Sequence, residues 1–185
     1  MSLDLQPTLA GPTLRLRPLR EADREALYAV ASDPLLWALH PARDRHERAV
    51  FDPLFDDSIR SGGALLVAER GSGRAIGSSR YSFQFAQAGE VEIGWTFLAR
   101  DHWGGPANRE IKRLMLRHAF GAVEQVMFRV GEENLRSRRA LEKIGARLTE
   151  RRQTATVGTR AVMHVVYAIA RADFLASPLN LEESA

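Results

Sequence analysis

The stretch that decides the fold is residues 99–120, which read ARDHWGGPANREIKRLMLRHAF. It begins as a loop with two adjacent glycines and continues from Asn108 as a helix, because its inward-facing side chains recur at the helical spacing i, i+3, i+4, i+7 and i+8. Those side chains belong to Ile111, Leu114, Met115, His118 and Ala119. Strands are predicted on either side of this unit, at residues 90–98 and 126–130. A strand, a helix and another strand in this order predict two parallel strands joined by a crossover helix.

Further strands and helices are predicted on both sides of this unit. Apolar runs and alternation predict strands at residues 13–17, 64–68, 74–83 and 162–169. Helices are predicted at residues 21–31, from Pro53 toward Gly62 with Asp52 as the cap, and from Asn134 to Gly145. The order of these elements indicates an α+β fold with a sheet that contains both antiparallel and parallel strands.

Composition excludes several classes of protein. Hydrophobic residues make up 45% of the 185 residues and charged residues 26%, the balance of a soluble globular chain. The absence of cysteine excludes disulfides, thiolate catalysis and cysteine-ligated zinc. No apolar run reaches the roughly 18 residues of a membrane-spanning helix, and the first residues lack the order of a signal peptide. We therefore expect a cytoplasmic protein without a membrane partner, folded as a single domain (residues 1–185) with a core at about 13–170 and loosely held ends at 1–12 and 174–185.

The basic charge does not point to nucleic acid. The formal net charge is +3 and the sequence pI is about 9.8, but 24 of the 26 basic residues are arginine, a skew more typical of genome composition than of a binding surface. The chain has neither a sheet-face aromatic motif nor a helix-turn-helix signature, so no nucleic-acid partner is expected. No group of His, Asp and Glu has metal-ligand spacing, and no metal is expected either.

The glycine loop before Asn108 is a candidate anion site. Glycines let backbone N–H groups approach an anion, and the helix N-terminus that follows adds partial positive charge. A pyrophosphate is the expected guest, although an ordinary strand-to-helix turn has the same appearance. A nucleoside-triphosphate P-loop is rejected because no Gly-Lys-Ser/Thr is present, and the dinucleotide glycine spacing is absent as well.

A second stretch, NLRSRRALEKIGA at residues 134–146, makes the pattern specific. Taken alone, Asn134 is a helix cap and Ser137 a small inward-facing side chain. In order along the chain stand GSSRY (77–81), VEIGWT (91–96), NREIK (108–112), HAF (118–120) and this stretch. Together they resemble the GNAT superfamily of acetyl-CoA-dependent N-acetyltransferases, and within it the branch that acetylates the N-termini of ribosomal proteins. The resemblance covers residues 13–169.

The resemblance implies an α+β domain whose mixed central sheet has about seven strands, is splayed in the middle and carries helices on both faces. It also implies that the pantetheine arm of acetyl-CoA lies between the strand that ends at Leu98 and the strand at Val126. The residues it assigns to acetyl-CoA are Thr96, Phe97, Leu98, His102, Trp103, Gly104, Gly105, Ala107, Asn108 and Asn134. The phosphate loop departs from the family pattern, because His102 replaces the usual Arg or Gln and Pro106 removes one backbone N–H. How strongly the pyrophosphate binds is left open by this departure.

The implied reaction is direct attack of a primary amine on the thioester in a ternary complex. Glu92 is the candidate general base, since partial burial would raise its pKa; an ion pair with an arginine such as Arg80 is the alternative, and Glu90 is the substitute base. Ser137 is the candidate partner of the leaving thiolate, because Leu141 and Ile144 stand where many relatives carry a tyrosine. A backbone N–H near Thr96 or Phe97 is expected to bind the oxyanion.

Trp37, His40 and Tyr81 are candidates for the acceptor pocket, with core packing as the alternative for Trp37 and Tyr81. The acceptor amine is expected on a small molecule or a protein N-terminus, and the chain is expected to be a monomer or a homodimer. A CoA-binding regulatory module without catalysis is the alternative function, and the altered phosphate loop is its support. Acetyl-CoA separates the two, because only an enzyme releases the CoA thiol.

Overall fold

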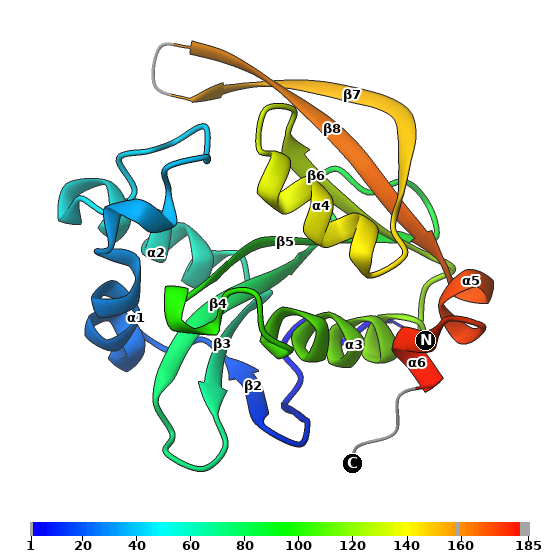
Figure 1. Ribbon diagram of the computed structural model, residues 1–185, viewed down its shortest axis with the longest axis horizontal. Coiled ribbons are helices and arrows are strands. Elements are labelled where there is room, and N and C mark those ends of the chain that lie inside the picture. Colours follow the sequence, from blue (N-terminus) through cyan, green and yellow to red (C-terminus); the bar gives the residue numbers. More distant parts are fainter. Residues whose placement is uncertain (1, 158–159, 182–185) are drawn as a thin grey trace.

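The central element is a mixed sheet, which the computed structural model describes through residues 2–157 and 160–181. Within these residues the sheet has eight strands in the order β1-β2-β3-β4-β5-β6-β8-β7 (Figure 1). Neighbouring strands are antiparallel except β5 and β6, which are parallel. The strands are β1 (Leu9–Ala10), β2 (Leu14–Pro18), β3 (Ala64–Glu69), β4 (Ala75–Ser82), β5 (Glu90–Leu98), β6 (Gln125–Gly131), β7 (Arg147–Val157) and β8 (Arg160–Ala170). The predicted α+β fold is confirmed, with slightly more strands than expected.

Helices cover both faces of the sheet (Figure 1). The face under α3 and α4 carries the larger apolar cluster, which includes Ile111, Met115 and Leu141. The other face carries a second cluster under α1 and α2, which includes Leu27 and Phe55. The helices are α1 (Arg24–Ala31), α2 (Arg48–Arg60), α3 (Ala107–Ala119), α4 (Leu135–Lys143), α5 (Arg171–Leu175) and α6 (Pro178–Leu181), with short 3₁₀ turns η1 (Glu21–Asp23), η2 (Pro34–Leu36) and η3 (Arg100–His102). Among the residues described, none of these helices is long and apolar enough to cross a membrane.

The two parallel strands separate after a short paired section. β5 pairs with β6 only from Glu90 to Glu92, opposite residues 125–127, although both strands run on for several residues more. The backbone of β5 is kinked at Trp95, a non-glycine residue with φ of 50°, and the register against β4 shifts at the same place. Such a bulge re-aims the side chains that follow it. The sheet therefore opens between β5 and β6 as the family resemblance implies.

The start of α2 corrects one prediction. The helix begins at Arg48 and contains Pro53 in its interior, whereas Pro53 was expected at its first turn. Two forces extend the helix upstream: Phe51 and Phe55 lie one turn apart and are both buried, and the Arg48 guanidinium is 2.8 Å from the Asp52 carboxylate one turn later. These contacts compensate for the hydrogen bond that a proline cannot donate.

The chain ends, which are expected to be loosely held, have apolar contacts with the core at residues 2–12 and 174–181, while Met1 and residues 182–185 lie outside the described residues. Phe174 and Leu179 are buried in the larger cluster, and Leu3, Leu5 and Leu9 pack against it. Strand β7 was not predicted, because its sequence RLTERRQTATV is rich in polar residues and has no inward apolar run. It pairs with β8 along most of its length, and the two form a long hairpin at one edge of the sheet (Figure 1).

Candidate active site

A cavity of about 200 Å³ lies at the separated ends of the parallel strands. Its wall is formed by the end of β5, the loop before α3, the start of α4 and the segment after α1. Twelve of the residues that the sequence singles out line it: Trp37, His40, Thr96, Phe97, Leu98, His102, Trp103, Gly104, Gly105, Asn108, Asn134 and Ser137. The fold thus gathers residues up to 100 positions apart in the chain around one space.

The glycine loop forms one end of this cavity. Gly104 has φ of 74°, a conformation that favours glycine, and it turns the chain into the first turn of α3. Ala107 begins that helix but lines a neighbouring hollow on the other side of the loop. His102 is held from outside the cavity, because its Nε2 lies 3.1 Å from the Glu69 carboxylate. The backbone amides of the loop, rather than the imidazole, are therefore the groups best placed for an anion.

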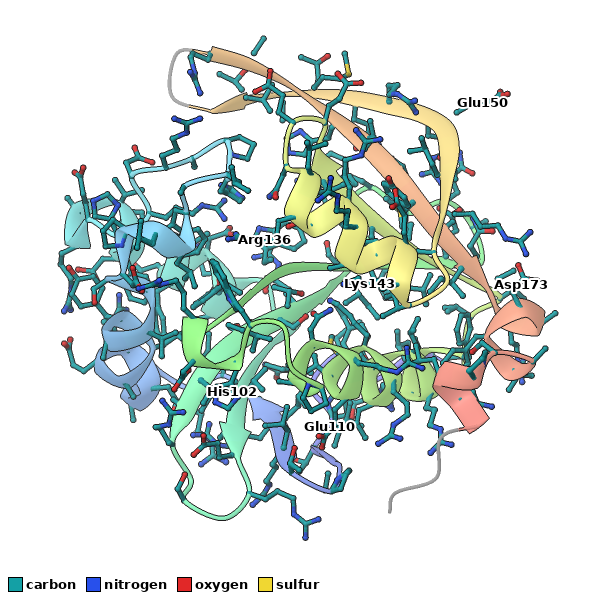
Figure 2. All side chains as sticks on the ribbon, in the orientation of Figure 1. His102, Glu110, Arg136, Lys143, Glu150 and Asp173 are labelled. Atoms are coloured by element: carbon teal, nitrogen blue, oxygen red, sulfur yellow. The ribbon has the colours of Figure 1, made fainter. Side chains whose placement is uncertain are left out.

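Arg136 is a wall residue that the sequence did not single out. Its guanidinium stacks 3.9 Å from the centre of the Trp103 ring, and its Nη2 donates a hydrogen bond of 2.9 Å to the carbonyl of Leu36. Figure 2 shows it at the end of α4 that faces α1 and α2. Partial burial lowers the pKa of Arg136, and its guanidinium forms no ion pair with the described residues. In the sequence, the only signal for Arg136 is its place next to Ser137 in the stretch at residues 134–146.

The start of α4 brings the two predicted residues of that helix to the cavity. Asn134 is the N-cap, as expected, and its Oδ1 accepts a 3.2 Å hydrogen bond from the backbone N–H of Ser137. Asn134 is buried and Ser137 half-buried, and both line the cavity. The cap fixes the first turn of α4, which carries Ser137 at the cavity wall.

Glu92 lies beside the cavity rather than on its wall. Its side chain is 2% exposed, and Oε1 accepts a 2.9 Å hydrogen bond from Arg129 Nε. Its other oxygen, Oε2, is buried without a hydrogen-bond partner among the described residues. Burial raises the pKa of Glu92, and the charges of Arg129 and Arg80 only partly oppose this. The alternative for Glu92, an ion pair with an arginine such as Arg80, is therefore present, but the arginine is Arg129. Arg80 instead pairs with Asp57 at 2.7 Å.

Glu90 is fully engaged by hydrogen bonds. Its two carboxylate oxygens each lie 2.9 Å from Arg151 Nη1, and it also accepts from the Gln87 backbone and the Gln125 side chain. Burial acts to raise the pKa of Glu90, but the hydrogen bonds from Gln87 and Arg151 outweigh it and hold the pKa below its ordinary value. A carboxylate so bound is a poor base, which favours Glu92 over Glu90.

The three residues assigned to the acceptor divide into two groups. Trp37 and His40 line the cavity, and their rings meet edge to face with centroids 5.7 Å apart. Burial and the charge of Arg45 lower the pKa of His40 to about 3, so its ring is neutral at physiological pH. Tyr81 is not at the cavity: it is 1% exposed, and its hydroxyl donates a 2.7 Å hydrogen bond to the carbonyl of Met115 in α3. Tyr81 therefore packs in the core, which is the alternative given for it, and does not line the cavity as an acceptor residue would.

Lys112 is the second functional candidate that the sequence did not reveal. It lies in α3 with 4% of its surface exposed, and its Nζ donates a 2.7 Å hydrogen bond to Thr96 Oγ1 on the cavity wall. Burial lowers the pKa of Lys112 to about 7. Its position directly after the inward-facing Ile111 was the only available signal.

No group of three His, Cys, Asp or Glu side chains that could hold a metal ion occurs in residues 2–157 and 160–181.

An opened parallel strand pair, with an amide-lined loop at a helix N-terminus on one side, defines the class of acyl-CoA-dependent transferases. The sequence model of the acetyltransferase (GNAT) domain matches residues 13–147, and the chain belongs to this family. It is an acetyl-CoA-dependent N-acetyltransferase, a member of the family to which the sequence motifs pointed.

Solved structures of other acetyltransferases share the fold. A GCN5-related N-acetyltransferase from Brucella melitensis is 23% identical with a TM-score of 0.82, over 95% of this chain and 83% of that one. Mycobacterium smegmatis RimJ in complex with CoA-disulfide is 19% identical with a TM-score of 0.71, over 98% and 95% of the two chains. Spermidine N-acetyltransferase from Vibrio cholerae, in complex with CoA and spermine, is 16% identical with a TM-score of 0.63, over 88% and 98%.

Proposed function

We propose that the protein transfers the acetyl group of acetyl-CoA to a primary amine by direct attack in a ternary complex, and that the cavity between β5 and α4 holds the thioester. The observation that carries this proposal is the convergence of the loop at Gly104 and Gly105, the open edge of β5 and the capped start of α4 on one space. In this arrangement the loop amides hold the pyrophosphate, and the unpaired backbone of β5 runs along the pantetheine.

The acceptor ammonium must lose a proton before it can attack, and Glu92 is the proposed base. It is a buried carboxylate with one oxygen, Oε2, without a protein partner, and its raised pKa brings it nearer to the working pH. Because Glu92 is not on the cavity wall, a water molecule carries the proton to it. His40 lines the cavity, but a pKa of about 3 makes its ring a weak base.

The tetrahedral oxyanion and the leaving thiolate each need a donor. We assign the oxyanion to a backbone N–H beside Thr96 or Phe97, where β5 is not paired with β6. Ser137 Oγ then supports the thiolate from α4. The acceptor enters beside Trp37 and His40, and it is an amine on a protein N-terminus or a small molecule; the Vibrio cholerae relative was solved with spermine, which illustrates the second kind.

Besides the altered phosphate loop, one structural observation favours the regulatory-module alternative: Arg129 pairs with Glu92 and occupies one of the two carboxylate oxygens of the proposed base. The two functions are separated by incubating the protein with acetyl-CoA and a panel of amines, which includes an N-terminal peptide, a polyamine and an aminoglycoside. We expect acetyl-CoA to raise the melting temperature and at least one amine to release CoA thiol. Stabilisation without thiol release from any amine would support the regulatory module, and the absence of stabilisation would contradict both.

The phosphate site has its own test. Replacing Gly105 with tryptophan should abolish the stabilisation by acetyl-CoA, because the large ring would fill the space at the loop. Gly105→Ala is the matched control, since an added Cβ there would meet nothing closer than a carbonyl oxygen at 3.8 Å. We expect 3′-dephospho-CoA to retain most of the effect in the wild type. Normal binding by the tryptophan variant would place the pyrophosphate elsewhere.

A further inference from the structure

Lys112 is a buried amine in a chain that has only two lysines. It lies in α3 and is 4% exposed, whereas Lys143 is exposed and lies at the far end of α4 (Figure 2). An ammonium group is seldom buried in this way without an ion pair. Burial is the sole cause of the lowered pKa of Lys112, so no carboxylate of the described residues compensates its charge.

The contacts of Lys112 connect it with the cavity. Its Nζ lies 2.7 Å from Thr96 Oγ1 and 5.6 Å from the centre of the Phe128 ring on β6. Thr96 is part of the cavity wall, and its Oγ1 also lies 2.7 Å from Ser79 Oγ. The Thr96 hydroxyl is also 3.4 Å from the carbonyl of Gly94. Thr96 therefore connects the ammonium with the wall of the space where the thioester is proposed to lie.

The kink in β5 makes this contact possible. In a regular strand Thr96 would share a face with Glu92, because side chains alternate. The bulge at Trp95, where φ is 50°, shifts this alternation by one residue. Trp95 then lies on the side of Arg80, whose guanidinium is 3.6 Å from the centre of its ring, and Thr96 faces Lys112 on the other side. The strained backbone at Trp95 therefore lets Thr96, a residue of the cavity wall, contact the buried amine of Lys112.

Other charged groups nearby face away from Lys112. On β6, Phe128 faces Lys112 while Arg129 binds Glu92 on the opposite face of the sheet. On β5, Glu92 likewise lies on that opposite face. From its own helix, Glu110 is directed toward the backbone of Leu14. The ammonium of Lys112 has one polar contact in the described residues, and that contact leads to the cavity.

We infer that Lys112 is a positioning residue that acts on the leaving group through Thr96. The Lys112 ammonium supplies a proton, by way of the Thr96 hydroxyl, to the sulfur of CoA. The inference rests on the proposed function of the cavity. As the C–S bond of the tetrahedral intermediate breaks, its electron pair moves to sulfur, the sulfur takes the hydrogen of the Thr96 hydroxyl, and the Thr96 oxygen takes a hydrogen from the Lys112 ammonium. Lys112 is left as a neutral amine and is reprotonated from solvent after CoA departs.

A purely structural role does not account for a lysine at this place. A methionine of similar length would fill the same space without a charge to desolvate. If Lys112 served packing alone, Lys112→Met would therefore leave the reaction and the bound cofactor unchanged. This difference makes the inference testable with one substitution and its controls.

The first experiment titrates the thiol of CoA bound to the protein, through the ultraviolet absorbance of the thiolate. We expect its pKa to lie at least about one pH unit lower in the wild type than in Lys112→Met, because the ammonium stabilises the thiolate. Lys112→Arg should retain most of the effect, and Lys143→Met should match the wild type. An unchanged thiol pKa in Lys112→Met that still binds CoA would overturn the inference, and leave the proposed function intact.

The second experiment measures steady-state kinetics with an amine that the wild type acetylates. Lys112→Met should lower kcat by roughly 10- to 100-fold with little change in the KM for acetyl-CoA, the scale of a lost proton donor. It should also remove the decline of kcat that follows loss of the Lys112 proton as pH rises. Thr96→Val should reproduce both effects and Thr96→Ser should restore the wild-type values; these two variants decide the matter if Lys112→Met does not fold. If both Lys112→Met and Thr96→Val have the same kcat as the wild type, the relay is rejected. If the wild type acetylates no amine, the proposed function is rejected instead, and the thiol titration alone decides on Lys112.

Discussion

Glu92 of β5 and Lys112 of α3 are buried charged residues on opposite faces of β5, and they have different partners. Glu92 has an ion pair with Arg129 at 2.9 Å, while Lys112 has only the hydroxyl of Thr96. Burial raises the pKa of the first and lowers that of the second, so both move toward the neutral form. A buried carboxylate of β5 and a buried ammonium of α3 can thus lie against the same strand without pairing, because they lie on its opposite faces, and Thr96 beside the kink at Trp95 contacts only the ammonium.

The largest expected effect is a change in the free energy of unfolding when Lys112 is replaced. Because the pKa of Lys112 falls from 10.5 to about 7 in the folded protein, desolvation opposes folding by about 5 kcal/mol wherever both states are protonated. Lys112→Met should therefore raise the free energy of unfolding by about 4 kcal/mol below pH 7, after the loss of one hydrogen bond. Between pH 7 and 10.5 only the unfolded chain holds the proton, so wild-type stability rises with pH and the advantage of the variant shrinks. Urea unfolding of both proteins at pH 6 and pH 9 measures it.

A control for this prediction is Lys143→Met, which removes a charge from an exposed position. It should change stability by less than about 0.5 kcal/mol. If Lys112→Met is less stable than the wild type at pH 6, then the buried ammonium is not a source of instability, and the contrast between the two faces of β5 fails.

The next largest effect is a loss of turnover when Glu92 is replaced. Glu92→Gln should leave acetyl-CoA binding intact and lower turnover by about 10²-fold or more, the scale of a lost general base. The loss should shrink at high pH, where the free amine is already abundant. In the wild type, kcat/KM should fall as pH drops through the raised pKa of Glu92, because the carboxylate must be ionised to accept a proton. Stopped thiol-release assays across pH measure both; wild-type turnover near neutral pH in the variant would exclude Glu92 and direct attention to Glu90.

The Ser137→Ala variant tests whether α4 provides a second hydrogen-bond donor to the leaving thiolate. Ser137→Ala should raise the barrier by about 1–3 kcal/mol, or roughly 5- to 150-fold in rate, with kcat affected more than KM. Stability should barely change, because alanine fits the same space and favours a helix. Steady-state kinetics and a melting curve on this variant are sufficient. Unchanged turnover with a small change in melting temperature would mean that Ser137 only fills space.

The smallest expected effect belongs to Arg136, which lies on the wall of the cavity away from both faces of β5. Its guanidinium stacks on Trp103 beside the glycine loop. Arg136→Gln should weaken acetyl-CoA binding by roughly 5-fold at low salt and by less at high salt, since a partly exposed charge is screened. Calorimetric titration at two ionic strengths checks this. The arginine has no part in holding the cofactor if the affinity is unchanged at low salt.

Most of the fold could be predicted from the sequence, because residues 90–130 carry strong periodicity and clear turn signals. The errors have identifiable physical causes. The start of α2 was misplaced because the aromatic contacts of Phe51 and Phe55 outweigh the local effect of Pro53. Strand β7 was missed because backbone pairing with β8, rather than apolar burial, defines it.

The site was predictable where it depends on the spacing of motifs, as with the glycine loop and Asn134. It was not predictable where it depends on the parity of a strand. The direction of Tyr81 depends on which face of β4 it occupies, and the contact between Lys112 and Thr96 depends on a shift of alternation at Trp95. The partner of Glu92 is likewise set by the pairing of β5 with β6, which brings Arg129 beside it.

The most direct test of the claim that Lys112 is a buried, unpaired ammonium linked to the cavity is the titration of the lysine side chains by NMR, with carbon-13 at the ε position. The chain has two lysines, so the spectrum has two signals, and the Lys143→Met variant assigns them. We predict that Lys112 titrates near pH 7 in the free protein, and that its midpoint rises when CoA is bound as the thiolate, because the anion stabilises the ammonium. A Lys112 signal that titrates near its ordinary value of 10.5 in the free protein, and does not respond to CoA, would contradict the account.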